Sequence, residues 1–372
     1  MNQVLRRLSD KAVRRGTDKI RVSICFSSSS VFQKLFHKQS VSGQTYPPLV
    51  WVEKLGLPDP SELGGLDLSV KSVFLLPFCV MHPKFMIIDR ESVVLPSCNV
   101  SWESWFEGAV TLSGPVVQQF VKFYHAFWER REDVSALGDA STGHTGSEEA
   151  TDNGHAGKST LKSSVHLSIS GVHTVFLPSP HRRNPNYSLF ASSDSILAPT
   201  TPLNTFILTL FAKAERSIRI QTPNVTAPPV LSALLKALAR GVDVQILTSE
   251  RLMILEQLVT AGTTTSRCIQ TLIKRYRRLL SNPRHLANDE EAAIASTKPG
   301  RLHISFFEPI GGPKKRGDEG GEPQQSHLKM TIVDEEVLVL GSGNLDRASW
   351  FTSQELGAVS YTHLTLPTIY SV

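Results

Sequence analysis

One pattern of side chains occurs twice in this chain, and no other feature constrains the fold as strongly. In its second copy, His327 and Lys329 lie two residues apart at the start of a run that alternates toward a β-strand. Side chains of a strand repeat every two residues, so the imidazole and the ammonium project from the same face. Asp334 then interrupts the apolar run as a turn would, and the pattern predicts a β-hairpin over residues 327–344.

The second strand of this hairpin ends in two further polar residues, Ser342 and Asn344. The hairpin brings them back beside His327 and Lys329. An imidazole, a fixed cation and two neutral hydrogen-bonding groups suit a phosphoryl group, because its oxygens gain negative charge during reaction. We therefore expect this end of the hairpin to bind a phosphoryl group.

The first copy repeats the same residue types at the same offsets. It consists of His82, Lys84, Asp89, Ser97 and Asn99. Matching so many fixed positions twice by chance is improbable, so the repeat indicates two equivalent hairpins that act together. Two ordinary hairpins with surface histidines are the alternative interpretation.

The double motif resembles the phospholipase D superfamily, in which two such motifs meet at one active site across a pseudo-twofold axis. The resemblance implies an α/β fold of two pseudo-symmetric α/β/α domains packed around that shared site. Gly341 precedes Ser342, as is usual in the family, whereas Pro96 precedes Ser97 in the first copy.

Within this superfamily, residues 220–247 resemble a segment of cardiolipin synthases and related phosphatidyltransferases. In that group a strand ends in Thr-Pro and is followed by a helix and an Arg-Gly-Val-Asp-Val strand, and the same order of residues is present here. Asn224 stands where an aromatic residue is common, a departure that touches the wall of the pocket. The resemblance implies a glycerophospholipid substrate.

A longer internal repeat indicates which helices and strands are expected near the two ends of the chain. Residues 4–28 and 230–249 both read as an amphipathic helix, a glycine and a β-strand. Only the second copy has a helix and a strand before it, over residues 202–225, so the first domain is expected to lack its opening helix and strand. The sequence after Val359 departs from the repeat and is interpreted as non-native, which would leave the second domain without its closing helix. We therefore expect truncation at both ends.

A change in amino-acid composition marks the boundary between the two expected domains. A stretch rich in Gly, Ser, Thr, Asp and Glu, with almost no large apolar residues, predicts a disordered linker. The expected division is a first phospholipase D-like domain over 1–131, a linker over 132–164, a second phospholipase D-like domain over 165–359 and a tail over 360–372.

Charge and cysteine content limit the classes of binding partner and the cellular compartment that we expect. The formal net charge of +5 and the pI near 9.0 fit an anionic partner, either an acidic membrane surface or nucleic acid. A basic helical stretch over residues 252–284 could meet either one, with an ordinary exposed basic face as the alternative. The four cysteines show no paired spacing for a disulfide framework or a zinc site, and no run is long and apolar enough to cross a membrane. We expect an intracellular protein that is soluble or peripheral to membranes.

The paired motifs support a two-step mechanism that requires no metal and no cofactor. One neutral imidazole attacks phosphorus while the other, protonated, donates to the leaving oxygen, and a phosphohistidine results. The second histidine then activates water or an alcohol. By resemblance to the family, His82 is the expected nucleophile and His327 the acid and base. Lys84 and Lys329 offset charge on the phosphate, and the expected substrate-binding hydrogen bonds come from Ser97, Asn99, Ser342 and Asn344.

Four acidic residues complete the expected site. Glu355 follows Asn344 by eleven residues, where family members carry a glutamate that orients a histidine, and Glu107 is its counterpart in the first copy. Asp89 and Asp334 belong to the motif but lie beyond a strand's length from the imidazoles. They are expected to shape the hairpin turns rather than to transfer protons.

These residues predict a metal-independent phosphodiester hydrolase or phosphatidyltransferase that acts on glycerophospholipids through a phosphohistidine. Its expected partners are phospholipid and an anionic membrane surface, with no obligatory protein partner. A phospholipase D-type nuclease is the alternative within enzymes, since nucleic acid would also meet the net charge. Trp102, Trp105 and Phe106 could stack on bases, and core residues or contacts to acyl chains are equal alternatives for them. A non-catalytic membrane- or nucleic-acid-binding scaffold is the alternative outside enzymes.

Overall fold

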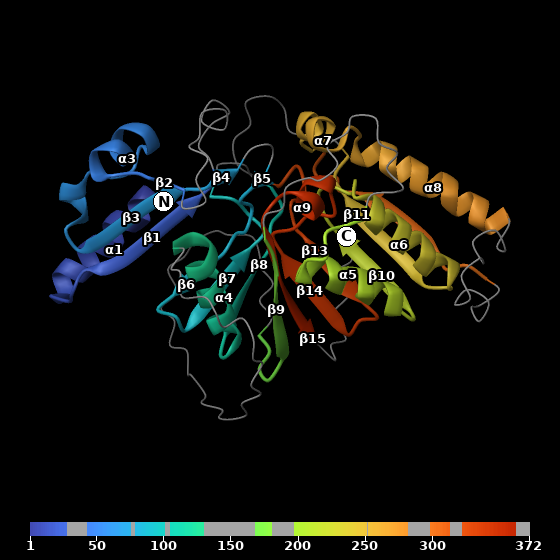
Figure 1. Ribbon diagram of the computed structural model, residues 1–372, viewed down its shortest axis with the longest axis horizontal. Coiled ribbons are helices and arrows are strands. Elements are labelled where there is room, and N and C mark those ends of the chain that lie inside the picture. Colours follow the sequence, from blue (N-terminus) through green and yellow to red (C-terminus); the bar gives the residue numbers. More distant parts are fainter. Residues whose placement is uncertain are drawn as a thin grey trace.

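The chain folds into two α/β halves that lie side by side (Figure 1). The computed structural model describes residues 1–27, 43–75, 79–100, 105–129, 168–180, 197–250, 252–281, 298–312 and 322–361. We call residues 1–129 the first half and residues 168–361 the second half. The expected α/β class with two related halves is confirmed, while the predicted linker over 132–164 and most of the predicted tail fall outside the described residues.

The second half is built on one seven-stranded sheet with the order β12-β11-β10-β13-β14-β15-β9. Strands β10, β11 and β12 run parallel, and the remaining neighbours are antiparallel. The strands are β9 His173–Ser179, β10 Ser217–Gln221, β11 Asp243–Thr248, β12 Leu302–Phe306, β13 Met330–Val333, β14 Val337–Gly341 and β15 Glu355–Tyr361.

Local sequence explains the helices that pack on this sheet. α5 (Pro202–Lys213) begins after Thr201, whose side chain caps it by accepting a hydrogen bond from the backbone N–H of Asn204. α6 (Pro228–Ala239) also begins with proline, which has no N–H to leave unpaired in the first turn. Apolar residues at helical spacing on both helices are buried in the main core of this half. The remaining helices are α7 Ile254–Ala261, α8 Thr265–Ser281 and α9 Arg347–Phe351.

The described strands of the first half form separate sheets instead of one. The orders are β1-β3-β2, β4-β5 and β6-β7-β8. The strands are β1 Ile20–Phe26, β2 Gln44–Thr45, β3 Leu66–Ser72, β4 Phe74–Leu75, β5 Cys79–Val80, β6 Met86–Ile88, β7 Ser92–Pro96 and β8 Ala109–Ser113. The helices are α1 Asn2–Arg15, α3 Pro48–Leu55 and α4 Val116–Tyr124, with short helical turns at Pro60–Leu63 and His125–Glu129.

The internal repeat relates these small sheets to the large one. The parallel pair β1-β3 corresponds to β11-β12, and the antiparallel set β6-β7-β8 corresponds to β13-β14-β15. In the second half, β10 pairs with both β11 and β13 and so joins the two parts. The described residues of the first half contain no strand in that place, and β1 and β6 belong to different sheets.

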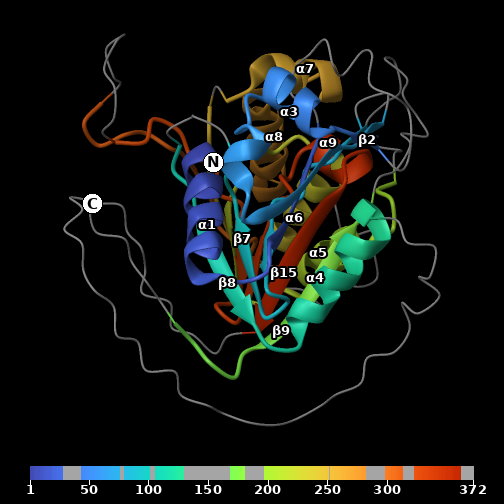
Figure 2. The ribbon, with the colours of Figure 1, turned by 90° about the vertical axis from the view of Figure 1, so that its left-hand side faces the viewer.

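The two halves share a hydrophobic core. α4 of the first half packs against β9 of the second, and Figure 2 shows α4 beside β9 and β15. The ring of Phe120 is fully buried, and its centroid lies 4.6 Å from that of Phe176 on β9. Leu356 and Ala358 of β15 belong to the same buried cluster. This cluster packs the first half against β9 and β15, the last two strands of the large sheet. Glu355 is the first residue of β15.

No helix in the described ranges combines the length and the apolar composition that crossing a bilayer requires.

Candidate active site

Both motif hairpins form as the repeat predicts. β6 and β7 are joined by a turn in which Asp89 and Arg90 have φ of 51° and 61°, and β13 and β14 by one in which Asp334 and Glu335 have φ of 54° and 62°. Positive φ at two successive residues gives the twist that a tight hairpin requires, and Asp tolerates it better than most residues.

Asp334 has a further structural contact. Its carboxylate accepts hydrogen bonds from the backbone N–H groups of Arg216 and Ser217, each at 2.8 Å, at the start of β10. The position of Asp334 agrees with the expected role in shaping the turn.

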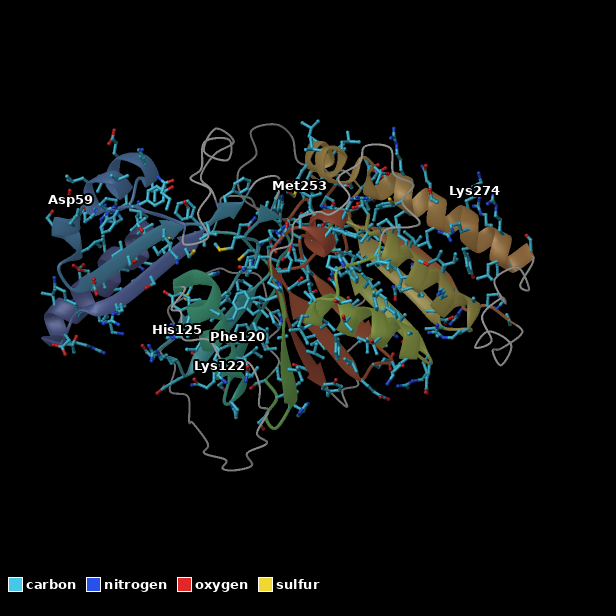
Figure 3. The ribbon with its side chains drawn as sticks, viewed as in Figure 1. Asp59, Phe120, Lys122, His125, Met253 and Lys274 are labelled. Carbon is cyan, nitrogen blue, oxygen red and sulfur yellow. The ribbon has the colours of Figure 1, made fainter. Side chains whose placement is uncertain are left out.

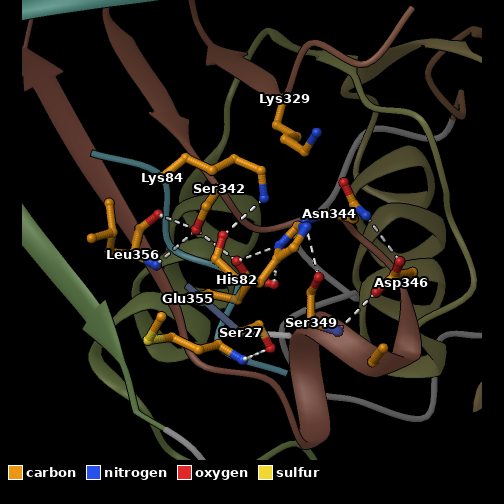
Figure 4. Close-up of polar contacts among 12 residues, drawn as sticks. Ser27, His82, Lys84, Lys329, Ser342, Asn344, Asp346, Ser349, Glu355 and Leu356 are labelled. Atoms are coloured by element: carbon orange, nitrogen blue, oxygen red, sulfur yellow. Dashed lines mark hydrogen bonds and ion pairs between the residues drawn. The ribbon is translucent and has the colours of Figure 1, made fainter. Parts of the chain in front are cut away.

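Each histidine is held by a glutamate from the opposite half. The Nδ1 atom of His82 lies 2.8 Å from Oε1 and 2.9 Å from Oε2 of Glu355 (Figure 4). The Nδ1 atom of His327 lies 2.8 Å from Oε1 of Glu107. The sequence indicated glutamates that orient histidines, and the structure adds that both pairs cross between the halves.

Backbone pairing sets this crossing. Met81 and Gln354 form a parallel β-bridge, and the N–H of His82 donates to the carbonyl of Gln354 at 3.1 Å. Phe106 and Ser326 form the equivalent bridge, and the N–H of His327 donates to the carbonyl of Phe106 at 2.9 Å. Each bridge joins the residue before a histidine to the residue before its glutamate. Backbone pairing between the two halves therefore places each histidine beside its glutamate.

The motif serines connect to the same carboxylates. Ser97 donates to Glu107, and Ser342 donates to Oε2 of Glu355 at 2.6 Å. Each serine oxygen also accepts a backbone N–H, from Gly108 at 3.0 Å and from Leu356 at 3.1 Å. The serines thus form the third member of a Ser–Glu–His chain in each half-site. Their expected contact with substrate stays a prediction.

The two motif asparagines have different environments. Asn344 is buried, and its Nδ2 donates to Asp346 at 3.0 Å, while its Oδ1 has no hydrogen-bond partner among the described residues. Asn99 is exposed and precedes a segment, 101–104, outside the described ranges. The half-sites are therefore related but unequal, and the expected binding role of either asparagine stays a prediction.

Both motif lysines are buried beside the histidines. Nζ of Lys84 donates to the carbonyl of His82 at 2.8 Å, and Nζ of Lys329 donates to the carbonyl of His327 at 2.6 Å. Burial lowers the pKa of Lys84 to about 8, although Glu355 and Glu107 oppose this. Burial also lowers the pKa of Lys329 well below its ordinary value, and the charge of Lys84 lowers it further. An anion bound between them would relieve this repulsion.

Burial lowers the pKa of both imidazoles, which favours their neutral forms. Burial lowers the pKa of His327 to about 4, although its hydrogen bond to Glu107 acts in the opposite direction. Burial likewise lowers the pKa of His82, against the opposing charge of Glu355. Each carboxylate keeps a pKa below its ordinary value despite burial, because its histidine and serine stabilise the charge. A neutral imidazole that donates from Nδ1 to a carboxylate presents an unprotonated Nε2 to the site.

The two half-sites lie within electrostatic range of each other. Burial has the largest effect on the pKa of each histidine. The lysine of the other copy has a smaller effect in the same direction: the charge of Lys329 lowers the pKa of His82, and the charge of Lys84 lowers that of His327. Figure 4 shows Lys84, Lys329 and Asn344 around His82. The histidines and lysines of the two copies therefore lie near one another, whereas Asp89 and Asp334 lie in the hairpin turns.

The sequence did not single out Gln354. It is buried beside Glu355 and pairs with Met81, and the position directly before an expected histidine-orienting glutamate is the signal that could have identified it. The sequence left Trp105 open between base stacking, the core and acyl-chain contacts; its ring centroid lies 4.8 Å from that of His327, so it packs beside the imidazole. Trp102 falls outside the described residues.

In the described ranges, no group of three His, Cys, Asp or Glu side chains is placed to hold a metal ion. The expectation that the reaction uses no metal or cofactor stays a prediction.

Part of the chain matches a described protein family. Residues 207–368 match the family described as cardiolipin synthase, PLD-like domain. No curated protein matches the chain by sequence.

Solved structures with a similar fold include the phosphatidylserine synthase of Haemophilus influenzae Rd KW20. It has 14% identity and a TM-score of 0.48, covering 97% of this chain and 80% of that chain. They also include Nuc, a phospholipase D family member from Salmonella typhimurium, with 18% identity, a TM-score of 0.30 and 51% and 84% coverage. NucT from Helicobacter pylori has 14% identity, a TM-score of 0.31 and 51% and 86% coverage.

The matched family model lies over the half that carries His327, and the first half repeats its motif and supplies the crossing partner of each pair. Over residues 207–368 the chain is therefore similar to the PLD-like domain of the cardiolipin synthase family.

Proposed function

We propose that the chain is a phosphodiesterase or phosphatidyltransferase that acts on glycerophospholipids through a phosphohistidine. The observation that carries the proposal is the pair of crossed His–Glu contacts, each at 2.8 Å, beside two buried lysines. Two oriented neutral imidazoles and two cations fit the charge changes at phosphorus when a diester bond is broken.

In the first step, Nε2 of His82 attacks phosphorus and a new N–P bond forms. Glu355, which accepts the Nδ1 proton, stabilises the positive charge that develops on the ring. The P–O bond to the leaving group breaks, and His327 donates a proton to that oxygen. His327 must be protonated for this step, and the negative charge of a bound phosphodiester raises its pKa from the value in the free site.

In the second step, neutral His327 removes a proton from water or an alcohol, whose oxygen attacks phosphorus. The N–P bond then breaks, and its electron pair returns to His82. The side chain of His82 is 22% exposed and that of His327 only 2%, which supports His82 as the group that the phosphorus atom reaches. Lys84 and Lys329 would stabilise the charge on the equatorial oxygens in both steps.

The choice of lipid rests on the matched family, whose description names cardiolipin synthase. A nuclease of the same mechanism is the second candidate, because the net charge is +5 and α8 carries a cluster of cationic side chains. Both candidates use the same half-sites, and they differ in what binds around them.

The test uses the protein with EDTA and without added metal. It is incubated with mixed phospholipids plus glycerol, and separately with single-stranded DNA, alongside His82→Ala, His327→Ala and the matched control His173→Ala, an exposed histidine on β9. We expect headgroup release or a new phosphatidyl ester, lost by at least about a hundredfold in both active-site variants and kept in His173→Ala. DNA cleavage with the same mutant pattern would instead favour the nuclease, and turnover that survives His82→Ala would contradict the mechanism.

A labelled substrate separates the roles of the two histidines. With phosphorus-labelled phospholipid, we expect covalent label on the wild-type protein and none on His82→Ala. Label that is lost in His327→Ala but kept in His82→Ala would reverse the assignment of nucleophile.

A further inference from the structure

The short helix α7 exposes its apolar side and buries a polar residue, which is the reverse of an ordinary surface helix. Its apolar residues Ile254, Leu255, Leu258 and Val259 are all exposed, with Leu255 80% accessible. They lie at positions i, i+1, i+4 and i+5, so they cover one continuous side of the helix, which we call the α7 face. Soluble proteins rarely leave such a contiguous apolar surface in water without a partner.

The side of α7 that is buried carries a glutamine. Gln257 donates through Nε2 to Oδ1 of Asn224 at 2.9 Å and to the carbonyl of Leu252 at 2.6 Å. Its Oε1 accepts from both the N–H and the hydroxyl of Thr265, at 2.6 Å and 3.0 Å. This network is well satisfied, so it fixes the orientation of the helix. The exposure of the α7 face therefore follows from a specific polar anchor on the opposite side.

The next helix supplies a cationic surface beside the apolar one. α8 contains no Asp or Glu, and Arg267, Lys274 and Arg278 are exposed. Their spacing of seven and four residues places the three side chains on one stripe of the helix. In Figure 3, Met253 at the start of α7 and Lys274 of α8 lie along the same upper edge of the molecule.

This surface lies close to the active site. Asn224, which binds Gln257, follows β10, and α7 contacts α9 directly after the second motif. The carboxylate of Glu256, on α7, is also near enough to contribute to the pKa of Lys84. Whatever binds the α7 face is therefore held next to the reacting groups.

We propose that the α7 face inserts into the surface of an anionic phospholipid bilayer, with the α8 cations binding the headgroups. An apolar face of branched side chains next to a purely cationic stripe fits the boundary between acyl chains and anionic headgroups better than it fits nucleic acid, which offers no apolar layer. The proposal deepens the lipid activity proposed above, but binding to a bilayer does not require catalysis. The two are therefore separable by experiment.

The test measures binding of the full chain to vesicles of phosphatidylcholine, with and without phosphatidylglycerol, by co-sedimentation. The variant is Leu255→Asp with Leu258→Asp, and the matched control is Leu49→Asp, because Leu49 is 82% exposed but belongs to α3, which lies in the first half, away from α7 and α8 (Figure 1). Transfer of one leucine side chain into hydrocarbon corresponds to roughly 10- to 100-fold in a partition constant. We expect at least this loss for the double variant and no loss for Leu49→Asp.

A second variant tests the cationic stripe. Replacing Lys274 and Arg278 by alanine should weaken binding to phosphatidylglycerol vesicles by roughly fivefold per charge, and added salt should weaken the wild type similarly. A Leu255→Trp variant gives a direct signal, because insertion shifts its fluorescence to shorter wavelength and brominated lipids quench it. No shift and no quenching would contradict the proposal even if the aspartate variants were unstable.

Other outcomes identify other occupants. A concentration-dependent dimer that Leu255→Asp abolishes, without vesicle binding, would assign the α7 face to a second copy of the chain and overturn the proposal. Hydrolysis of a soluble, monomeric diester separates this result from the proposed function. We expect the double α7 variant to hydrolyse it at the wild-type rate, whereas vesicle binding without any diester turnover would contradict the function and leave the docking surface supported.

Discussion

The two halves of the molecule place equivalent motif residues on unequal sheets. The second half has one continuous sheet in which β10 joins β11 to β13, whereas the corresponding strands of the first half lie in separate sheets. Even so, His82 and His327 each lie 2.8 Å from a glutamate oxygen. The two half-sites therefore have similar His–Glu geometry at the motif hairpins and β-bridges, although the described strands of the first half lie in separate sheets.

The half-sites differ more in burial than in geometry. Glu355 has a side chain that is 1% exposed and contacts His82 through both oxygens, whereas Glu107 is 19% exposed and contacts His327 through one. A carboxylate in a drier environment interacts more strongly with its partner. This difference predicts that the first histidine depends more on its glutamate than the second one does.

The largest expected effect follows from that difference. Glu355→Gln removes the charge that stabilises the ring of His82 as it becomes a cation, and we expect kcat to fall by about 10²- to 10⁴-fold. Glu107→Gln should cost at least several-fold less. Hydrolysis of a soluble diester measures both, with thermal unfolding as the control for folding. Equal losses in the two variants would show that burial does not distinguish the half-sites.

A second substitution tests the contact between the halves. Phe120→Ala opens the shared core beside Phe176, and the free energy of unfolding should fall by about 3–5 kcal/mol. Phe211→Ala, which is equally buried but lies in the core of the second half alone, should cost a similar amount. Only Phe120→Ala should also loosen the crossed His–Glu pairs. The measurement is denaturant unfolding together with the NMR signals of His82 and His327, and unchanged signals in both variants would argue against coupling through this core.

The smallest expected effect concerns pH. Burial holds the pKa of His327 at about 4 in the folded chain, against 6.5 for the exposed residue, so the unfolded chain binds more protons between these values. Stability should therefore fall as the pH is lowered from 6.5 to 4, by on the order of 3 kcal/mol from this residue. The pKa of Glu107 is also below its ordinary value, which acts in the same direction at still lower pH. His327→Asn should lose most of this dependence in denaturant unfolding at several pH values, whereas an unchanged slope would contradict the assignment.

Much of the fold and site could be predicted because the signals were local. The offsets between His82, Lys84 and Asp89, repeated at the second motif, predicted both hairpins and the turn positions of the aspartates. Offsets along the chain cannot show which glutamate meets which histidine, because that depends on parallel bridges between segments far apart in sequence. The exposure of Asn99 against the burial of Asn344 depends in the same way on neighbours supplied by the rest of the fold.

The region of α7 and α8 shows a different limit. The sequence predicted helices and a cationic stretch, and both are present. Apolar periodicity alone would have placed Ile254 and Leu258 against the core. The buried contact between Gln257 and Asn224 turns the opposite side of the helix toward the core. A single buried hydrogen-bond network of that kind produces no periodic pattern that the sequence could show.

The crossed His–Glu pairs also constrain how such a chain can change over generations. A substitution at Glu355 alters the environment of His82, which lies in the other half of the gene, and a substitution at Glu107 acts on His327. Compensating changes must then arise across the internal repeat, and recombination that replaces one half alone would separate partners that were selected together. Covariation among related sequences should accordingly link position 82 with 355 and position 107 with 327 more strongly than it links either histidine to the glutamate of its own half.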